Sequence, residues 1–347
     1  MGATAELESA TGLVPQSWLL RAFLALLLFL LLPLLLLRAP LLPAAALLLP
    51  ASSSGAAGAS ADPSYLVRGE RAFCAPLRDY GGTDPAKSIL FFLHPGAPPY
   101  WVSTPVPDHV KLGEKALAAG GWLPTGYGYD GVQRYVEGSA RDAIVLDVGG
   151  HFGFFGLSIA ATGRSVVAFE PVPSSQRLHQ LGVCRNGFFD RYTLVRGAVG
   201  EEDGNLTLHV PAGSWTDNAA LAKSASTALV GGASVPIGVR VFTLDAFAAA
   251  HLSKAQVARI CLVKVDVQGQ EAAVFRGGKG LFSQLTRGTW VIAEHVPELV
   301  SASGFAPLED VKAIVALGYT VHGEHGGPEI GADKWGQVPF DLWYRKT

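Results

Sequence analysis

Short apolar runs and amphipathic segments alternate along the chain from about residue 140 to its end. AIVLDV (143–148) has the length and composition of a buried strand, and GFFGLSIAATG (153–163) follows with the spacing of a helix that ends at Gly163. Strands alternating with helices indicate an α/β fold with a doubly wound, mainly parallel, Rossmann-like sheet. The same pattern predicts further strands over 165–170, 192–200, 260–269, 290–295, 319–323 and 340–346, and helices over 174–186, 270–276 and 308–318.

A turn signal follows the third predicted strand. EEDGNLTLHV (201–210) turns at Asp203-Gly204 into another strand, which predicts a hairpin. The stretch 211–236 has few order signals and is long for a loop, so it is either an insertion without a role or a segment in which Trp215 stacks on a sugar ring.

The chain divides into three parts by composition. Residues 1–64 hold an apolar N-terminal segment and a stem rich in Ala, Ser and Gly. Residues 65–140 are rich in Gly, Pro and aromatic residues, which predicts an irregular extension with one short helix near 109–119. Residues 141–347 form the regular α/β domain.

The apolar run at 22–37 has sixteen uncharged residues between Arg21 and Arg38. Its length lies between the core of a signal peptide and a full membrane span, and flanking arginines can lengthen a span by reaching the interface. We favour a single-pass anchor that faces the Golgi or ER lumen, and the alternative is secretion after signal cleavage. The sequon Asn205-Leu206-Thr207 fits either route.

Charge and cysteine content exclude some classes of protein. The net charge of −2 gives no basic footprint for nucleic acid. The three cysteines contain no CxxC pair, which excludes a zinc ribbon. Cys261 lies in a predicted buried strand and reads as an inert thiol, whereas Cys74 and Cys184 could form one disulfide that their spacing does not require.

The stretch VLDVGGHFG (145–153) joins the first α/β strand to its helix. It places Asp147 at the strand end, followed by Gly149, His151 and Gly153, and matches neither the dinucleotide fingerprint nor a P-loop. Glycines let a backbone approach a ligand closely, and an acid at this point suits a cationic group. S-adenosylmethionine has such a group, with its ammonium and sulfonium. The alternative is an ordinary tight turn.

Two further positions complete the predicted cofactor site. Glu170 ends the next strand, 23 residues after Asp147, where a carboxylate can accept both ribose hydroxyls. Ala198, at the end of the third predicted strand, is the other expected cofactor contact.

Four ordered motifs over roughly residues 143–300 resemble the FkbM family of methyltransferases: VLDVGGHFG, AFEPVP, VFTLDAF and VKVDVQGQE (263–271). The resemblance implies a class I methyltransferase fold, S-adenosylmethionine as donor, and O-methylation, often of sugar hydroxyls. The chain departs from the family pattern where His151 replaces the usual Asn and Gln268 replaces the usual Glu. The second change removes a charge near the expected active site.

A sugar hydroxyl is a poor nucleophile at neutral pH, so a general base is expected. Asp266 is the first candidate, and Lys264 shares its face of the strand, paired with Asp266, Glu271 or Glu294 either for catalysis or as a structural ion pair. Glu294 and His295 are adjacent and point to opposite faces, and an imidazole is a suitable base, although a structural role for His295 is the alternative. The spacing of these residues demands no metal site, and none is predicted.

These observations predict an S-adenosylmethionine-dependent O-methyltransferase with a glycan or other polyol acceptor, attached to a membrane by its N-terminal segment and with no nucleic-acid partner. A methyltransferase-like binding module without turnover is one alternative, motivated by Gln268. A Golgi-type glycosyltransferase is a weaker one, because only Asp266 and Gln268 stand at the spacing of a D-x-D acid pair.

Overall fold

The computed structural model describes residues 65–79, 87–91, 100–104, 130–211, 234–338 and 340–347. Within these ranges no helix combines the length and the apolar character needed to cross a membrane. The predicted anchor (22–37), the stem (51–64), the predicted helix near 109–119 and Trp215 lie outside the described residues.

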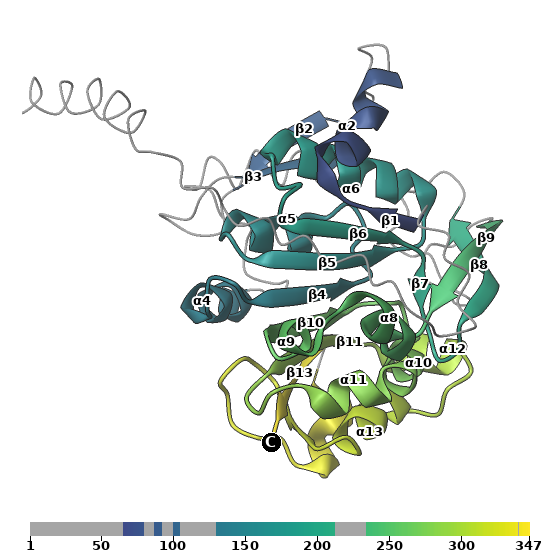
Figure 1. Cartoon of the computed structure of the whole chain (residues 1–347). Helices are drawn as coiled ribbons and strands as arrows, with labels where there is room; N and C mark the ends of the chain where they lie inside the picture. The colour runs from purple at the N-terminus through teal and green to yellow at the C-terminus, as the bar shows by residue number, and fades with distance from the viewer. Residues whose placement is uncertain (1–64, 80–86, 92–99, 105–129, 212–233, 339) are drawn as a thin grey trace, which may run out of the picture. The chain divides into compact units, whose positions relative to one another are not determined.

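An eight-stranded sheet carries the fold, in the order β1-β6-β5-β4-β10-β11-β13-β12 (Figure 1). The five strands from β6 to β11 run parallel, while β1, β13 and β12 pair antiparallel at the two edges. The prediction of a mainly parallel α/β sheet is confirmed. The strands span Leu66–Val67 (β1), Ile144–Val148 (β4), Ser165–Glu170 (β5), Tyr192–Arg196 (β6), Ile260–Val265 (β10), Trp290–His295 (β11), Tyr319–His322 (β12) and Phe340–Lys346 (β13).

Helices cover both faces of this sheet, so its central strands are apolar on both sides. On β4, Val145 packs into one core with α5 and α6, whereas Leu146 packs into the other with α8, α10, α11 and α13. Strand parity therefore decides which core a side chain enters. The helices that border the first core span Gly69–Asp79 (α2), Asp130–Gly138 (α4), Phe154–Ala161 (α5) and Pro173–Asn186 (α6); those that border the second span Leu244–His251 (α8), Glu271–Gly277 (α10), Lys279–Gln284 (α11) and Glu309–Val315 (α13).

The remaining elements are short. The hairpin β2 (Lys87–Phe91) and β3 (Tyr100–Thr104) forms a two-stranded sheet, and β3 contacts α5 and α6. Helices α9 (Lys254–Val257) and α12 (Pro297–Ala302) and a 3₁₀ helix (Ala332–Gln337) are further short elements.

The third predicted strand, 192–200, is wrong as a single element. It breaks at Gly197, where a side chain would overlap Phe242, and β7 (Ala198–Val199) joins a separate three-stranded sheet in the order β7-β9-β8. The predicted hairpin is also wrong, because β9 (Ser234–Phe242) lies between β7 and β8 (Gly204–Pro211).

The sequence does not predict β9, because Pro236 and Gly238 are unfavourable in strands and weaken its strand pattern. Among the described strands, only β8 pairs with this part of β9, since β7 reaches no further than Val241 and Phe242. A proline is tolerated there because one edge of the strand needs no ladder hydrogen bond.

A disulfide joins Cys74 on α2 to Cys184 on α6, across 110 residues of sequence. It attaches the start of the described chain to the helix that follows β5. Cys261 is a free thiol on β10, and burial raises its pKa, as expected for an unreactive cysteine.

Candidate active site

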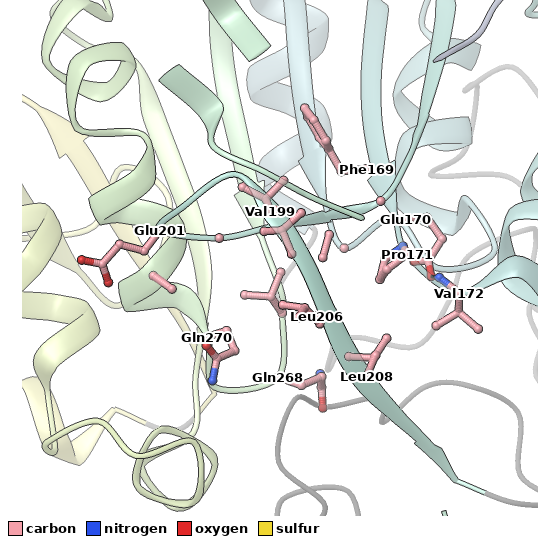
Figure 2. A pocket seen from close by; sticks show the side chains of 18 of the residues that line it. Phe169, Glu170, Pro171, Val172, Val199, Glu201, Leu206, Leu208, Gln268 and Gln270 are labelled. Atoms are coloured by element: carbon pink, nitrogen blue, oxygen red, sulfur yellow. Dashed lines mark hydrogen bonds between the residues drawn. The ribbon is translucent and has the colours of Figure 1, made fainter. Parts of the chain in front are cut away.

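A cavity of about 520 Å³ lies beyond the carboxyl ends of β4, β5 and β10, with β8 as one wall (Figure 2). This is the edge at which doubly wound sheets bind ligands. Of the residues predicted from the sequence, the cavity lining includes Gly149, His151, Glu170, Ala198 and Asp266. It does not include Asp147, Gly153, Lys264 or His295.

The glycines of the turn after β4 are required by packing. Gly149 has φ +84°, and a Cβ there would overlap the backbone carbonyl of Asp266. Gly153 has φ +87°, and a Cβ there would overlap the ring of His179. Close approach to a ligand therefore remains an explanation for Gly149, which lines the cavity, whereas Gly153 is a glycine because α6 lies against it.

Glu170 is buried at the end of β5, with both carboxylate oxygens held by backbone amides. The N–H of His151 donates to Oε2 (2.7 Å) and the N–H of Val172 donates to Oε1 (2.8 Å). Burial raises the pKa of Glu170, and His151 and these amides act against that rise. Each oxygen can still accept a second hydrogen bond, which leaves room for a hydroxyl donor from the cavity.

His151 adopts φ +48°, a left-handed conformation that Asn, Asp and His enter more readily than most residues. The exchange of Asn for His at this position therefore preserves the shape of the turn. That shape directs the N–H of His151 at Glu170.

Lys264 lies beneath the turn and joins β10 to β4. Its Nζ is 3.4 Å from Oδ1 of Asp147 and 3.3 Å from Oδ2 of Asp266, and it donates to the carbonyl of Gly149 (2.8 Å). Asp147 is fully buried, and burial raises its pKa while Lys264 opposes the rise. Asp266 was among the predicted partners of Lys264; Asp147 was not.

The missed partner follows from strand register. Lys264 and Asp147 are directly paired neighbours on β10 and β4. The sequence identifies both strands but does not state that they are adjacent. The structure places Asp147 under the turn and away from the cavity surface, so it supports the turn through Lys264.

Gln268 connects the ends of β10 and β11. Its Nε2 donates to Oδ1 of Asp266 (3.0 Å) and to Oε2 of Glu294 (2.9 Å). Asp341 of β13 is the register partner of Glu294. Burial, with Asp266, Glu271 and Asp341 nearby, raises the pKa of Glu294 to about 9.

Residues 147–305 match the methyltransferase FkbM domain. The family predicted from the four motifs is thereby confirmed for this segment, and with it S-adenosylmethionine as the cofactor. No curated protein sequence matches the chain.

Two solved structures are among those to which this chain is similar. A TehB-like SAM-dependent methyltransferase from Corynebacterium glutamicum has 11% identity and a TM-score of 0.35, with 69% of this chain and 97% of that chain covered. Precorrin-6y C5,15-methyltransferase from Geobacter metallireducens has 8% identity and a TM-score of 0.34, with 62% and 87% covered.

The residues around the cavity of the FkbM segment fit S-adenosylmethionine. The volume lies within the usual range of cofactor pockets. Among the described residues that line it, five are acidic and none is Lys or Arg, so the field favours a cationic ligand. The acidic lining residues are Glu170, Glu201, Glu202, Asp203 and Asp266.

Within the FkbM segment, Glu271 was predicted as a possible partner of Lys264 but holds a loop instead. Its Oε1 accepts from the N–H groups of Val267 (2.9 Å) and Gly269 (3.3 Å). Burial raises the pKa of this carboxyl to about 8. Glu271 thus fixes the loop that carries Gln268.

His295 lies on the opposite face of β11 from Glu294. Its Nδ1 is 2.7 Å from Oδ2 of Asp310 on α13, and both side chains are buried in the second core. The structural alternative for His295 fits this position. Its predicted role as a base would require access to the cavity, which His295 does not line.

The wall formed by β8 was not predicted. Leu206 and Leu208 line the cavity from this strand, near Gln268 and Gln270 in the view of Figure 2. Leu208 also packs with Val172 and Val239, which attaches the small sheet to the start of α6. The alternating apolar residues of NLTLHV were the available signal, but they could not show which side faced a ligand.

Proposed function

We propose that this protein transfers a methyl group from S-adenosylmethionine to a hydroxyl of a glycan or other polyol. The observation that supports this best is the shared cavity, which is lined by Gly149 of the turn after β4, by Glu170 and by Asp266. Asp266 has 32% of its side chain exposed, whereas Asp147 beside it has none. Asp266 is therefore the carboxylate of this ion-paired group that can meet an acceptor.

Each residue has a distinct role in this proposal. When bound, S-adenosylmethionine supplies a methyl group on a positively charged sulfur, which takes the electron pair of the broken C–S bond as the new C–O bond forms. Asp266 accepts the proton of the acceptor hydroxyl. Glu170 binds the ribose hydroxyls, and the turn at Gly149 orients the donor.

The wall formed by β8 supports a sugar-like acceptor. Leu206 and Leu208 present an apolar surface, and Asn205 and Gln270 offer polar groups around it. Sugar rings combine apolar faces with hydroxyls, so a surface of this mixed kind suits them. Anionic acceptors are disfavoured by the acidic lining.

Calorimetry on the full-length protein tests the donor site. We expect S-adenosylmethionine to bind to the parent, and Glu170→Gln to weaken binding at least tenfold, about 1.4 kcal/mol, because an amide cannot accept both ribose hydroxyls as a carboxylate does. Glu70→Gln, an exposed acid at the start of α2, is the matched control and should bind like the parent. Equal binding by all three proteins would show that Glu170 does not bind the donor.

A transfer assay with methyl-labelled donor and a panel of neutral glycans tests the reaction. A methyl ether that resists mild base identifies O-methylation of a hydroxyl, whereas a base-labile product would indicate an ester. Donor binding with no transfer to any acceptor would favour the alternative motivated by Gln268, a methyltransferase-like binding module.

We further propose that the described part of the chain lies in the lumen of the secretory pathway, attached by the segment 22–37 or released after its cleavage. The Cys74–Cys184 disulfide supports this, because disulfides persist in oxidising compartments. The sequon residues Asn205 and Thr207 are exposed on β8, and Asn205 borders the cavity.

Expression of the full chain in secretory cells tests the location. A lumenal protein should lose mass on treatment with a glycosidase that removes N-linked glycans, and Asn205→Gln should abolish that loss. An unmodified Asn205 together with reduced Cys74 and Cys184 would contradict a lumenal location.

A further inference from the structure

Gln268 occupies a position where two carboxyl groups meet. One amide nitrogen donates to Asp266 (3.0 Å) and to Glu294 (2.9 Å), so a single NH₂ group supplies both of these hydrogen bonds. Gln268 adopts φ +56°, a left-handed conformation that is uncommon outside glycine. Residues with a strained backbone cluster at functional sites, and Gln268 lies at a cavity wall.

The bridge completes the contacts of Asp266. Oδ1 accepts from Gln268, and Oδ2 faces Lys264 at 3.3 Å. The hydrogen bond from Gln268 and the ion pair with Lys264 thus hold the carboxylate by one oxygen each. The second lone-pair direction of each oxygen stays available for a hydroxyl from the cavity.

The loop that carries Gln268 is itself held in place. Glu271 accepts from the N–H groups of Val267 and Gly269 on either side of Gln268. Gly269 has φ +91°, and a Cβ there would overlap the carbonyl of Leu299. The amide therefore reaches Asp266 and Glu294 from a backbone with little freedom to shift.

A carboxyl side chain at this position could not make the same bridge. It has no N–H to donate, and when ionised it would face two more carboxyl oxygens at hydrogen-bond distance. Such a group needs either a proton or a divalent cation. The amide makes both unnecessary.

We propose that Gln268 is a positioning residue: its amide holds the Asp266 carboxylate toward the acceptor and keeps Asp266 and Glu294 together without a cation. The role of Asp266 rests on the proposed function, whereas the bridge itself does not. The charged and titratable groups around the bridge are Lys264 on β10, Asp266 directly after β10, Glu294 on β11, Asp341 on β13, Glu271 on α10 and Asp147 on β4.

The decisive experiment compares Gln268→Glu with the parent by thermal unfolding of the full-length protein between pH 6 and pH 9, in EDTA and in millimolar Mn²⁺ or Ca²⁺. At pH 6 Glu294, whose pKa is raised to about 9, holds a proton that it can donate to the new carboxyl, and the melting temperature should match that of the parent. Above pH 8 in EDTA it should fall by roughly 3–6 °C relative to the parent. Either cation should restore it.

Gln270→Glu is the matched control. Gln270 also lines the cavity, and this substitution adds the same charge two residues away from position 268. It and the parent should show no response to cations. A Gln268→Glu protein whose pH profile and cation response equal those of Gln270→Glu would overturn the proposal.

A second variant separates positioning from support of the fold. Gln268→Ala should bind S-adenosylmethionine within threefold of the parent, yet lower kcat for methyl transfer at least tenfold with little change in KM for the acceptor. If donor binding is lost as well, Gln268 supports the whole cavity and the positioning role is wrong. A parent that fails to bind the donor would refute the proposed function but leave the cation experiment to decide on the bridge.

Discussion

The ends of β10 and β11 hold two groups of ionisable side chains that differ in composition and in setting. The cavity-side network consists of Asp147, Lys264, Asp266, Gln268 and Glu294, with Asp266 partly exposed to the cavity. The His295–Asp310 pair lies on the other face of the sheet, and neither member has more than 1% of its side chain exposed. Glu294 and His295 are neighbours in sequence, yet they belong to different groups.

The difference shows that nearness to the carboxyl end of a strand does not make a residue part of a site. Both groups satisfy that condition, but only one is on the face where the turn after β4 opens. On the other face α13 covers the strand end, and His295 meets Asp310 instead of a ligand. The two groups should therefore respond differently to substitution.

The largest expected effect is that of Lys264→Met. It removes the cation beside the fully buried Asp147 and the donor to the carbonyl of Gly149. An unpaired buried charge costs about 3–5 kcal/mol of unfolding free energy, to be measured by denaturant titration. S-adenosylmethionine binding should also weaken at least tenfold, because the turn loses its support.

The double variant Lys264→Met with Asp147→Asn is the control. Removing both charges should recover part of the lost stability, because no buried ion is then left without a partner. A single Lys264→Met variant within 1 kcal/mol of the parent would mean that Asp147 is neutral in the native protein.

His295→Leu should have a smaller effect on stability and none on the cofactor. It leaves the buried Asp310 without its imidazole partner, which should cost about 2–3 kcal/mol of unfolding free energy. The dissociation constant for S-adenosylmethionine should stay within twofold of that of the parent. Asp310→Leu should have the same effects on stability and on donor binding. A tenfold loss of donor binding in either variant would show that His295 and Asp310 contribute to the active site.

Much of this arrangement could be predicted from the sequence because its signals are local. The apolar runs of β4, β5 and β11 predicted the bounds of these strands to within one residue, and the position of Glu170 at a strand end identified it as a site residue. The opposite faces of Glu294 and His295 follow from the two-residue period of a strand.

The rest depends on contacts between distant segments. The pairing of Lys264 with Asp147 requires knowing that β4 and β10 are neighbours in a given register. Both faces of the sheet are covered by helices, so parity alone cannot tell which face adjoins a cavity. β9 was missed because its partner β8 stabilises a strand whose own composition is weak.

The last expected effect is a pH dependence that belongs to the cavity side. The pKa of Glu294 is raised from 4.5 to about 9 in the folded protein, so the folded state binds this proton more tightly than the unfolded state does. The resulting stability is fully present below pH 4.5 and is lost as the pH rises through about 9. One such group contributes a slope of at most about 1.4 kcal/mol per pH unit.

Glu294→Gln should flatten this slope, because an amide does not titrate, and the difference from the parent should be largest near pH 9. Thermal unfolding from pH 5 to pH 9 measures it, with Glu298→Gln as the matched control, an exposed acid four residues further along the chain. Glu271, with a pKa raised to about 8, keeps part of the slope in both variants. The His295→Leu protein should retain the parent's dependence on pH over this range if Glu294 and Glu271 are its source. A slope that disappears with His295 and survives Glu294→Gln would assign the titration to the other face of the sheet and reverse the comparison.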